Sequence, residues 1–386
     1  MSTRVLIVDD SELVRRVLKQ QLDRDPDINV IGTAEDPLEA SEKIESLEPD
    51  VLTLDLEMPK MDGLTFLRSL MRHHPMPVVI VSAYTTKGSR LAMEALESGA
   101  VDIVPKPGMA YSIGEMSSEL AAKVKAASAA NLRHHATEGH APPINRRDHT
   151  FAPQPTAAAG QAHGVRHRMP AARVGASGVA DSGAPMQVLA RLQGTLPANR
   201  VIAIGSSTGG TQALQYILSR LPDNMPPILI VQHMPQGFTK TFADRLNMLS
   251  ALEVKEAEHE DVLAQGRALV APGSKHMILR RTGARYWTEI TDGPKVCRQK
   301  PSVEVLFQSV AKATGKWAVG AILTGMGADG AQGMLSMKQQ GAATIAENED
   351  SCVVFGMPKE AIKLGGVDHV AHLHRIPYLL HKLAQG

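Results

Sequence analysis

Short apolar runs alternate with amphipathic segments five times in the first 127 residues. The runs are rich in Val, Ile and Leu and have the length of buried strands: 5–8, 28–34, 51–54, 78–82 and 102–104. Segments with apolar residues at helical spacing, such as 11–22 and 63–74, lie between them. This alternation predicts a five-stranded, doubly wound parallel sheet with helices on both faces.

The same alternation resumes near residue 200. Strand-like runs at 201–204, 228–232 and 318–325 are each followed by a helical pattern. The stretch from Val262 to Ile290 differs, because its short alternating runs are separated by Gly turns. We predict a second doubly wound, mostly parallel α/β domain that carries an antiparallel hairpin in this stretch.

Residues 128–185 break the globular pattern. They include 14 Ala, 6 Gly and 6 Pro but only seven of Leu, Ile, Val, Phe and Met. Such a segment buries too little apolar surface to offset its ordering entropy, which predicts a flexible linker. Six of the 15 histidines lie here, so a metal-binding tract is an alternative, although no regular spacing favours it. The predicted domains are therefore 1–127 and 186–386.

Length and composition agree with this division. The 386 residues suffice for two or three domains, and 43% of them are hydrophobic, as expected of chains with a real core. Cys297 and Cys352 are the only cysteines, too few for a disulfide framework. No apolar run approaches the ~20 residues of a membrane helix, and the N-terminus turns acidic too early for a signal peptide. These features predict a soluble cytoplasmic protein.

Charge separates the two predicted domains. Residues 1–127 carry a net charge of −7, residues 128–185 carry +3 and residues 186–386 carry +5. The overall charge of +1 excludes a global electrostatic attraction to nucleic acid or acidic membranes. Opposite signs on tethered domains favour their docking to each other.

Polar residues follow the predicted strands of the first domain. Asp9 and Asp10 end the first strand, Asp55 the third and Ser82 the fourth, and Lys106 follows the fifth. In a parallel sheet these positions meet at one edge. Three clustered carboxylates fit a hydrated Mg²⁺, and one of them could attack a phosphoryl group while a lysine neutralises its oxygens. The alternative, helix capping by the two aspartates and a surface lysine, does not explain five such residues at five matching places.

Residues 3–126 resemble the response-regulator receiver family in the motifs VDD, TLDLEMPKMDG, VSA and VPKP. The resemblance implies a flavodoxin-like fold in which Asp55 is the phosphoacceptor. Asp9 and Asp10 would then hold Mg²⁺ together with Asp55 and the backbone carbonyl of Glu57.

The same resemblance implies that Ser82 and Lys106 contact the phosphoryl group and that the Lys106–Pro107 bond is often cis. A histidine kinase would be the phosphodonor. Ile103 stands where receivers usually have an aromatic residue, so no aromatic switch is expected.

Three residues in the second domain each follow a predicted strand: Ser207, His233 and Asp329. Their strands end at one edge of a parallel sheet, so side chains 26 and 96 residues apart can converge. A serine on a strand–turn–helix elbow, a histidine base and an orienting aspartate make a hydrolytic triad. Backbone N–H groups near Thr208 and Met326 are candidate oxyanion donors.

Pattern alone leaves other functions open for this domain. A Gly-rich turn after a strand can cradle a phosphate, although the G-x-G-x-x-G pattern and a Walker-type lysine are missing. A purely structural sheet with Gly turns is a further alternative. The order Ser, His, Asp excludes the α/β-hydrolase fold, in which the histidine comes last.

The segments IAIGSSTGG, VQHMPQGFT, APGSKHM, KPSVEVLF, AILTGMGADG and SCVVFGMPKEA resemble the CheB chemotaxis methylesterase family from about Arg200 onward. The resemblance implies protein-glutamate methylesterase and protein-glutamine glutaminase activity, with Ser207, His233 and Asp329 as the triad. Chemoreceptors would be the substrates, and the hydrolysis would need no cofactor, since Mg²⁺ serves only the receiver.

Two rival classes make different predictions. A transcriptional regulator would need a basic recognition helix, and residues 186–386 have neither a helix-turn-helix pattern nor a basic stripe. A non-catalytic adaptor would keep the receiver acids and lack the triad. We therefore expect a phosphorylation-activated serine hydrolase without direct membrane insertion.

Overall fold

The computed structural model describes all residues except 1, 60, 84, 107–112, 131–199 and 386. The N-terminal domain alternates strands and helices: β1 Thr3–Val8, α1 Glu12–Leu22, β2 Ile28–Ala34, α2 Pro37–Leu47, β3 Val51–Asp55, α3 Gly63–His73, β4 Val78–Ser82, α4 Thr86–Glu97, β5 Asp102–Pro105 and α5 Ile113–Ser128. All strand pairs are parallel, in the order β2-β1-β3-β4-β5. The predicted five-stranded fold is confirmed.

Local sequence signals start the first four helices of this domain. In each case a side-chain oxygen of the residue before the helix accepts a hydrogen bond from a backbone N–H of the first turn, which satisfies a donor that the helix itself cannot. The capping residues are Ser11, Asp36, Asp62 and Thr85. Apolar side chains of α2, α3 and α4 pack on one face of the sheet, and those of α1 and α5 pack on the other.

The C-terminal domain is built on a seven-stranded sheet of order β14-β13-β12-β6-β7-β9-β8, with parallel pairing throughout. Its strands are β6 Val201–Ser206, β7 Ile228–Gln232, β8 Glu253–Glu256, β9 Arg267–Val270, β12 Ala318–Ile322, β13 Ala343–Glu347 and β14 His369–Ala371. A separate antiparallel hairpin is formed by β10 His276–Thr282 and β11 Arg285–Thr291. The predicted mostly parallel sheet with a hairpin is confirmed.

Helices cover both faces of this sheet. Apolar residues of α7 Gly210–Leu218, α8 Phe238–Leu249 and α12 Ile376–Gln385 pack on one face. Residues of α9 Val303–Thr314, α10 Ala331–Gln339, α11 Met357–Lys363 and the hairpin pack on the other. The sequence assigned the run at 267–270 to the hairpin region, and this assignment is wrong. That run is β9, which pairs with β7 and β8 because its apolar residues are buried inside the sheet.

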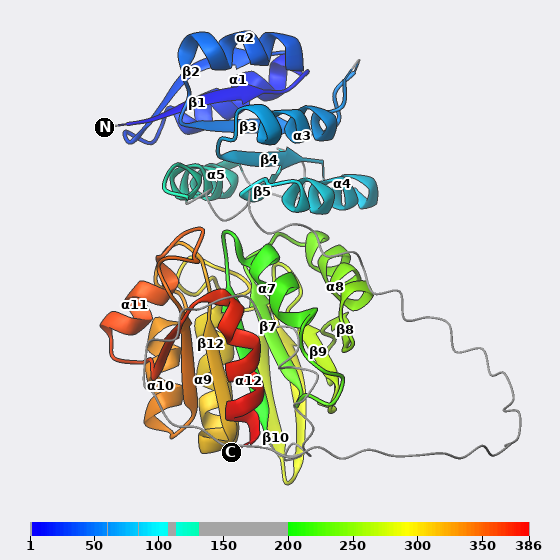
Figure 1. Ribbon diagram of the computed structural model, residues 1–386, viewed down its shortest axis with the longest axis vertical. Coiled ribbons are helices and arrows are strands. Elements are labelled where there is room, and N and C mark those ends of the chain that lie inside the picture. The colour runs from blue at the N-terminus through cyan, green and yellow to red at the C-terminus, as the bar shows by residue number, and fades with distance from the viewer. Residues whose placement is uncertain (1, 60, 84, 107–112, 131–199, 386) are drawn as a thin grey trace, which may run out of the picture.

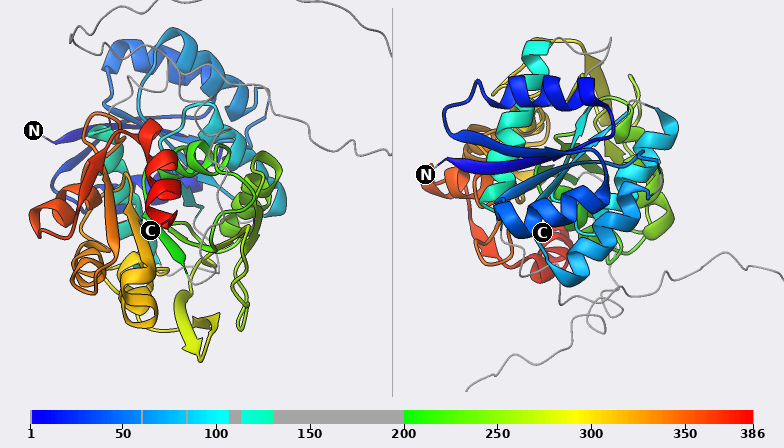
Figure 2. Two further views of the ribbon diagram at one scale, coloured as in Figure 1. Left: turned by 60° about the horizontal axis from the view of Figure 1, so that its bottom comes forward. Right: turned by 90° about the horizontal axis from the view of Figure 1, so that it is seen from above.

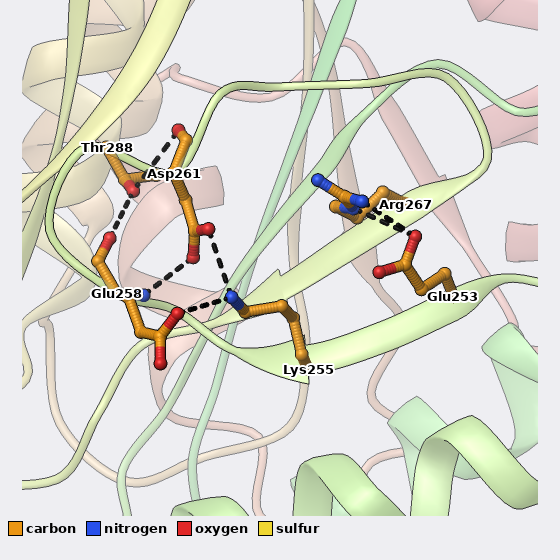
Figure 3. Close-up of polar contacts among 6 residues, drawn as sticks. All are labelled: Glu253, Lys255, Glu258, Asp261, Arg267 and Thr288. Carbon is orange, nitrogen blue, oxygen red and sulfur yellow. Dashed lines mark hydrogen bonds and ion pairs between the residues drawn. The ribbon is translucent and has the colours of Figure 1, made fainter.

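Charged residues line the β8 edge of the sheet (Figure 3). Arg267 of β9 pairs with Glu253 of β8 at 2.9 Å. Lys255 contacts Glu258 at 2.7 Å and Asp261 at 3.0 Å. Such charges on an edge strand disfavour pairing with a strand of another chain.

A hydrogen bond joins the same segment to the hairpin. Thr288 Oγ1 of β11 donates to the Glu258 carbonyl at 2.8 Å. The loop that follows β8 is thereby held against the hairpin as well as against the sheet edge.

The N-terminal domain lies against the end of the C-terminal domain from which α7 and α8 begin (Figure 1). Helix α4 packs against α7 and α8, and the view from above shows one domain over the other (Figure 2). In the part of the chain that the structure describes, no helix is long and apolar enough to cross a membrane. Most of the predicted linker and Pro107 lie outside the described residues.

One buried histidine predicts that the stability of the C-terminal domain depends on pH. His381 of α12 is fully buried, and among the described residues neither ring nitrogen has a hydrogen-bond partner. Burial lowers the pKa of His381, because the charged ring loses its hydration. The unfolded chain therefore binds more protons than the folded chain below about pH 6.5, and stability falls as the pH decreases through that value.

We predict that His381→Leu flattens this dependence. One group contributes a slope of at most about 1.4 kcal/mol per pH unit, and urea unfolding monitored between pH 5 and pH 8 measures it. The exposed His369 supplies the matched control His369→Leu, which should keep the wild-type slope. An unchanged slope in His381→Leu would assign the acid sensitivity to other groups.

Candidate active site and phosphorylation site

The three candidate triad residues meet at the carboxyl edge of the large sheet. Ser207 directly follows β6 and His233 directly follows β7, while Asp329 lies in the loop between β12 and α10. These strands are neighbours in the order β12-β6-β7, which brings their ends together. All three residues are buried, with exposed fractions of 8%, 5% and 2%.

Ser207 sits on a tight turn between β6 and α7. Its N–H donates to the Thr324 carbonyl at 3.0 Å, and its carbonyl accepts from Gly210 N at 2.7 Å. Gly209 has φ +79°, a left-handed conformation that glycine adopts without strain. A Cβ at Gly325 would lie 2.6 Å from Ser207 Cβ, so the loop after β12 approaches the serine at a distance that only glycine allows.

The Asp329 carboxylate holds His233. His233 Nε2 lies 2.7 Å from Asp329 Oδ2, which also accepts from Val303 N at 2.8 Å. Asp329 Oδ1 accepts from Ser302 Oγ at 2.7 Å and Glu304 N at 2.9 Å. Burial alone would raise the pKa of Asp329, but the bonds from His233 and from the first turn of α9 outweigh it and lower the pKa. The carboxylate therefore stays ionised and fixes the orientation of the imidazole.

Ser207 and His233 line the same small cavity, whose volume is about 10 Å³. Because Nε2 faces Asp329, Nδ1 is the nitrogen available to the serine, and it has no hydrogen-bond partner among the described residues. The structure thus brings together the three residues that the sequence singled out. Their arrangement is that of a nucleophile, a base and an orienting carboxylate.

Sequence reasoning missed two residues that support this group. Gln232 Oε1 accepts from Ser206 Oγ at 2.7 Å, and Gln232 Nε2 donates to the Ser207 carbonyl at 2.8 Å. Ser302 caps α9 and donates to Asp329. Gln232 and Ser302 lie in the motifs VQHMPQGFT and KPSVEVLF of the sequence analysis, but their spacing in the sequence did not indicate these hydrogen-bond partners.

The two expected oxyanion donors are near the serine in the chain or in space. Thr208 follows Ser207 in the turn that precedes α7, and Met326 follows the glycine packed against Ser207. Within the described residues no acceptor binds the N–H of either one. Free backbone N–H groups beside the nucleophile are suited to a developing negative charge.

A second polar group lies at the carboxyl edge of the N-terminal sheet. Asp9, Asp10 and Asp55 offer carboxylate oxygens that all lie within 4.8 Å of one another. Lys106 Nζ is 2.9 Å from Asp9 and 2.8 Å from Asp55. Burial raises the pKa of Asp9, and Lys106 counteracts this only in part. Three acids against one lysine leave excess negative charge, so the donor set fits a hard divalent cation such as Mg²⁺.

The remaining predicted residues of this site lie nearby. Glu57 N donates to Asp55 Oδ1 at 3.1 Å, which places the Glu57 peptide beside the expected phosphoacceptor, while its side chain pairs with Lys87 at 3.1 Å. Ser82 is fully buried at the end of β4 and donates to the Gly88 carbonyl of α4 at 3.1 Å. Its hydroxyl therefore ties the strand to the helix that packs on the C-terminal domain.

The N-terminal domain covers the triad. Thr208 Oγ1, one residue from Ser207, donates to Asp102 Oδ2 of β5 at 2.6 Å. Asp102 and Lys123, which pair at 2.8 Å, line the same cavity as Ser207 and His233. A volume of about 10 Å³ admits a water molecule but no glutamyl-sized side chain.

Further contacts fix the two domains beside this cavity. Gln212 Nε2 of α7 donates to the carbonyls of Leu96 at 2.9 Å and Ala100 at 3.2 Å. Arg245 of α8 pairs with Glu97 of α4. The acidic and basic domains thus dock as their net charges predicted, although hydrogen bonds to backbone carbonyls contribute as well.

The fold and the two sites define a class. An acidic cluster with a lysine at the edge of a β2-β1-β3-β4-β5 sheet is typical of a response-regulator receiver, and a serine beside a buried histidine–aspartate pair is typical of a serine hydrolase. Residues 5–116 match the family model of the response regulator receiver domain, and residues 202–380 match that of the CheB methylesterase.

Relatives match over nearly their whole length. A protein-glutamate methylesterase/protein-glutamine glutaminase of Syntrophus aciditrophicus is 49% identical, with 97% of this chain and 96% of the relative covered. One of Anaeromyxobacter dehalogenans is 48% identical, with 99% and 95% covered. The crystal structure of the Thermotoga maritima CheB methylesterase catalytic domain is 40% identical and has a TM-score of 0.47, with 48% of this chain and 98% of that chain covered. The chain belongs to the CheB methylesterase family.

The geometry predicts which of two adjacent serines reacts. In the chain activated with acetyl phosphate and Mg²⁺, a fluorophosphonate should label Ser207, and Ser207→Ala should abolish the labelling, because of the two serines only Ser207 lines the cavity that contains His233. Ser206→Ala should still be labelled but lose about 1–3 kcal/mol of stability, since Gln232 Oε1 would lose its buried donor. Mass spectrometry of the adduct and thermal unfolding measure both effects. If labelling were lost in Ser206→Ala and kept in Ser207→Ala, Ser206 would be the nucleophile.

Proposed function

We propose that this chain hydrolyses glutamyl methyl esters and glutamine amides on chemoreceptors, with its receiver domain controlling access to the site. The buried His233–Asp329 pair beside the elbow of Ser207 carries the proposal. Relatives that match over nearly their full length are named for these two activities.

Ser207 Oγ would attack the γ-carbonyl of the substrate while His233 Nδ1 takes the hydroxyl proton. His233 Nε2 keeps its bond to Asp329, whose ionised carboxylate stabilises the imidazolium. The N–H groups of Thr208 and Met326 would bind the oxyanion. The proton then passes from Nδ1 to the leaving group, which departs as methanol or ammonia. Water, deprotonated by the same nitrogen, hydrolyses the γ-glutamyl ester of Ser207.

Phosphorylation would occur at Asp55 in the receiver. Asp9, Asp10, Asp55 and the carbonyl of Glu57 would hold Mg²⁺, which neutralises phosphoryl oxygens when bound. Lys106 would neutralise a further oxygen, and the Ser82 hydroxyl would turn from Gly88 to the phosphoryl group. A histidine kinase would supply the phosphoryl group.

Release of the docked receiver would open the site. Lys106 directly follows β5, and Asp102 at the start of the same strand accepts the hydrogen bond from Thr208. Ser82 is bonded to α4, which packs on α7 and α8. A phosphoryl group on Asp55 therefore acts on the two elements that make the domain contact, and it shifts the equilibrium if it binds the undocked conformation more tightly.

The activity is tested with methylated, amidated receptor membranes. The protein should release methanol and ammonia, and Ser207→Ala should lose both products, because one acyl-enzyme serves both reactions. Gas chromatography and an enzyme-coupled ammonia assay measure them. An adaptor would release neither product, and a variant that loses only one would require two separate sites.

Loosening the domain contact should raise the basal rate. Arg245→Ala removes the pair with Glu97 without touching the triad, so we expect turnover without phosphodonor to rise about two- to tenfold. The exposed Lys240 of the same helix pairs within α8 with Asp244, so Lys240→Ala is the matched control and should change nothing. Methanol release measures the rate.

Acetyl phosphate and Mg²⁺ should raise the wild-type rate of methanol release and leave Asp55→Asn at its basal rate, because an amide cannot form an acyl phosphate.

A fragment from Met186 onward, which lacks the receiver, should release methanol faster than the unphosphorylated whole chain. A folded fragment that is no faster would leave the receiver as an activator only.

A further inference from the structure

A carboxylate that takes no part in the proposed reaction lies inside the hydrolase domain. Glu347 is the last residue of β13 and is completely buried between β12 and β14. Within the described residues no lysine, arginine or histidine pairs with it. Burying a carboxylate without a counterion is costly unless hydrogen bonds satisfy its oxygens.

Two donors satisfy Glu347. Its Oε2 accepts from the backbone N–H of Thr324 at 2.9 Å, and its Oε1 accepts from Ser351 Oγ at 3.0 Å. Cys352 faces the same carboxyl group as a neutral thiol, because burial raises its pKa far above the ordinary value. The donor that matters here is Thr324, because it lies in the loop that follows β12.

Thr324 is in direct contact with the nucleophile turn. Its carbonyl accepts from Ser207 N at 3.0 Å, and its Oγ1 donates to the Thr208 carbonyl at 2.9 Å. Thr324 Oγ1 also accepts from Val354 N at 2.9 Å. Thr324 is therefore held by Glu347 through its N–H, and it in turn holds Ser207 and Thr208 through its carbonyl and hydroxyl.

We infer that Glu347 is a positioning residue for the catalytic serine, acting through Thr324. It fixes the backbone N–H of Thr324, and the carbonyl and hydroxyl of the same residue hold the Ser207 N–H and the Thr208 carbonyl. The inference rests on the proposed role of Ser207 as the nucleophile. A misplacement of a reacting group by about 1 Å can cost on the order of 10²-fold in rate, so a residue behind the serine can affect turnover without touching substrate.

The chemistry of the carboxyl group identifies two informative variants. Glu347→Gln keeps an oxygen for Thr324 N, and its amide N–H can donate to Ser351 Oγ, which can then donate to Asn348 Oδ1, 2.8 Å away. Glu347→Leu has a similar size and removes the acceptor. Burial raises the pKa of Glu347 to about 7, and the protonated acid can make the same two bonds as glutamine.

The test uses the full chain activated with acetyl phosphate and Mg²⁺. Glu347→Leu should lower both kcat for methanol release and the rate constant for fluorophosphonate labelling by about 10- to 100-fold, with KM unchanged. Glu347→Gln should restore both to within about twofold of wild type. Glu349, two residues along and exposed, provides the matched pair Glu349→Leu and Glu349→Gln, which should leave both rates unchanged.

Several outcomes would overturn the inference. One is a folded Glu347→Leu protein that is labelled at the wild-type rate, and another is a Glu347→Leu protein whose KM rises while kcat stays constant. The third is a Glu347→Gln protein that is labelled as slowly as the leucine variant. If Glu347→Leu does not fold, Glu347→Met decides, because its unbranched side chain has a length similar to that of glutamate but no oxygen to accept from the Thr324 N–H, and it should slow labelling by about tenfold. Wild-type labelling in that variant would contradict the inference.

A parallel measurement separates this inference from the proposed function. If Ser207→Ala is still labelled and still turns over, the proposed nucleophile is wrong. If Ser207→Ala is inactive while Glu347→Leu reacts at the wild-type rate, the nucleophile stands and only the role of Glu347 fails.

Discussion

The buried Asp329 carboxylate is the interaction on which the geometry of the hydrolase site depends. It accepts from Ser302 and two backbone N–H groups at the start of α9, and it holds His233 at the end of β7. A buried charge that lost these partners would be strongly destabilising. The loop after β12, the first turn of α9 and the end of β7 are therefore constrained to stay together, and the imidazole is oriented before any substrate arrives.

Both domains place their polar site residues at the carboxyl ends of parallel strands, although the chemistry of the two sites differs. In each, the polar side chains lie just beyond the carboxyl ends of buried apolar strands, where helices begin and backbone N–H groups are free. The receiver places a lysine among carboxylates there, which suits a phosphoryl group and a cation. The hydrolase places a serine beside a histidine, which suits acyl transfer. The fold fixes where chemistry can occur, and the side chains determine which chemistry it is.

The sequence predicted the two sheets and the positions of Ser207, His233 and Asp329, because strand periodicity and the residue after each strand are local signals. It could not predict that Gln232 joins Ser206 to the Ser207 carbonyl, or that Glu347 bonds to Thr324, because these contacts depend on strand order. The strand at 267–270 was assigned to the wrong sheet for the same reason, since an apolar run does not indicate its neighbours. Net charges of −7 and +5 predicted docking, but not that Asp102 would meet Thr208.

Docking covers the site without dismantling it. In the docked chain the His233–Asp329 bond is formed at 2.7 Å and Ser207 keeps its backbone contacts, so the histidine is oriented and the serine turn is in place under the receiver. The docked receiver leaves no room for a substrate side chain, since the cavity beside Ser207 and His233 measures only about 10 Å³. The Thr208 hydroxyl, next to Ser207, is hydrogen-bonded to Asp102 of the receiver. In the proposed mechanism, activation would need only the free energy of separating two surfaces, without rebuilding a buried charge network around Asp329. The proposed separation would involve α4, which accepts the bond from Ser82, and β5, which adjoins Lys106, so a change at Asp55 would reach the domain contact through a few residues.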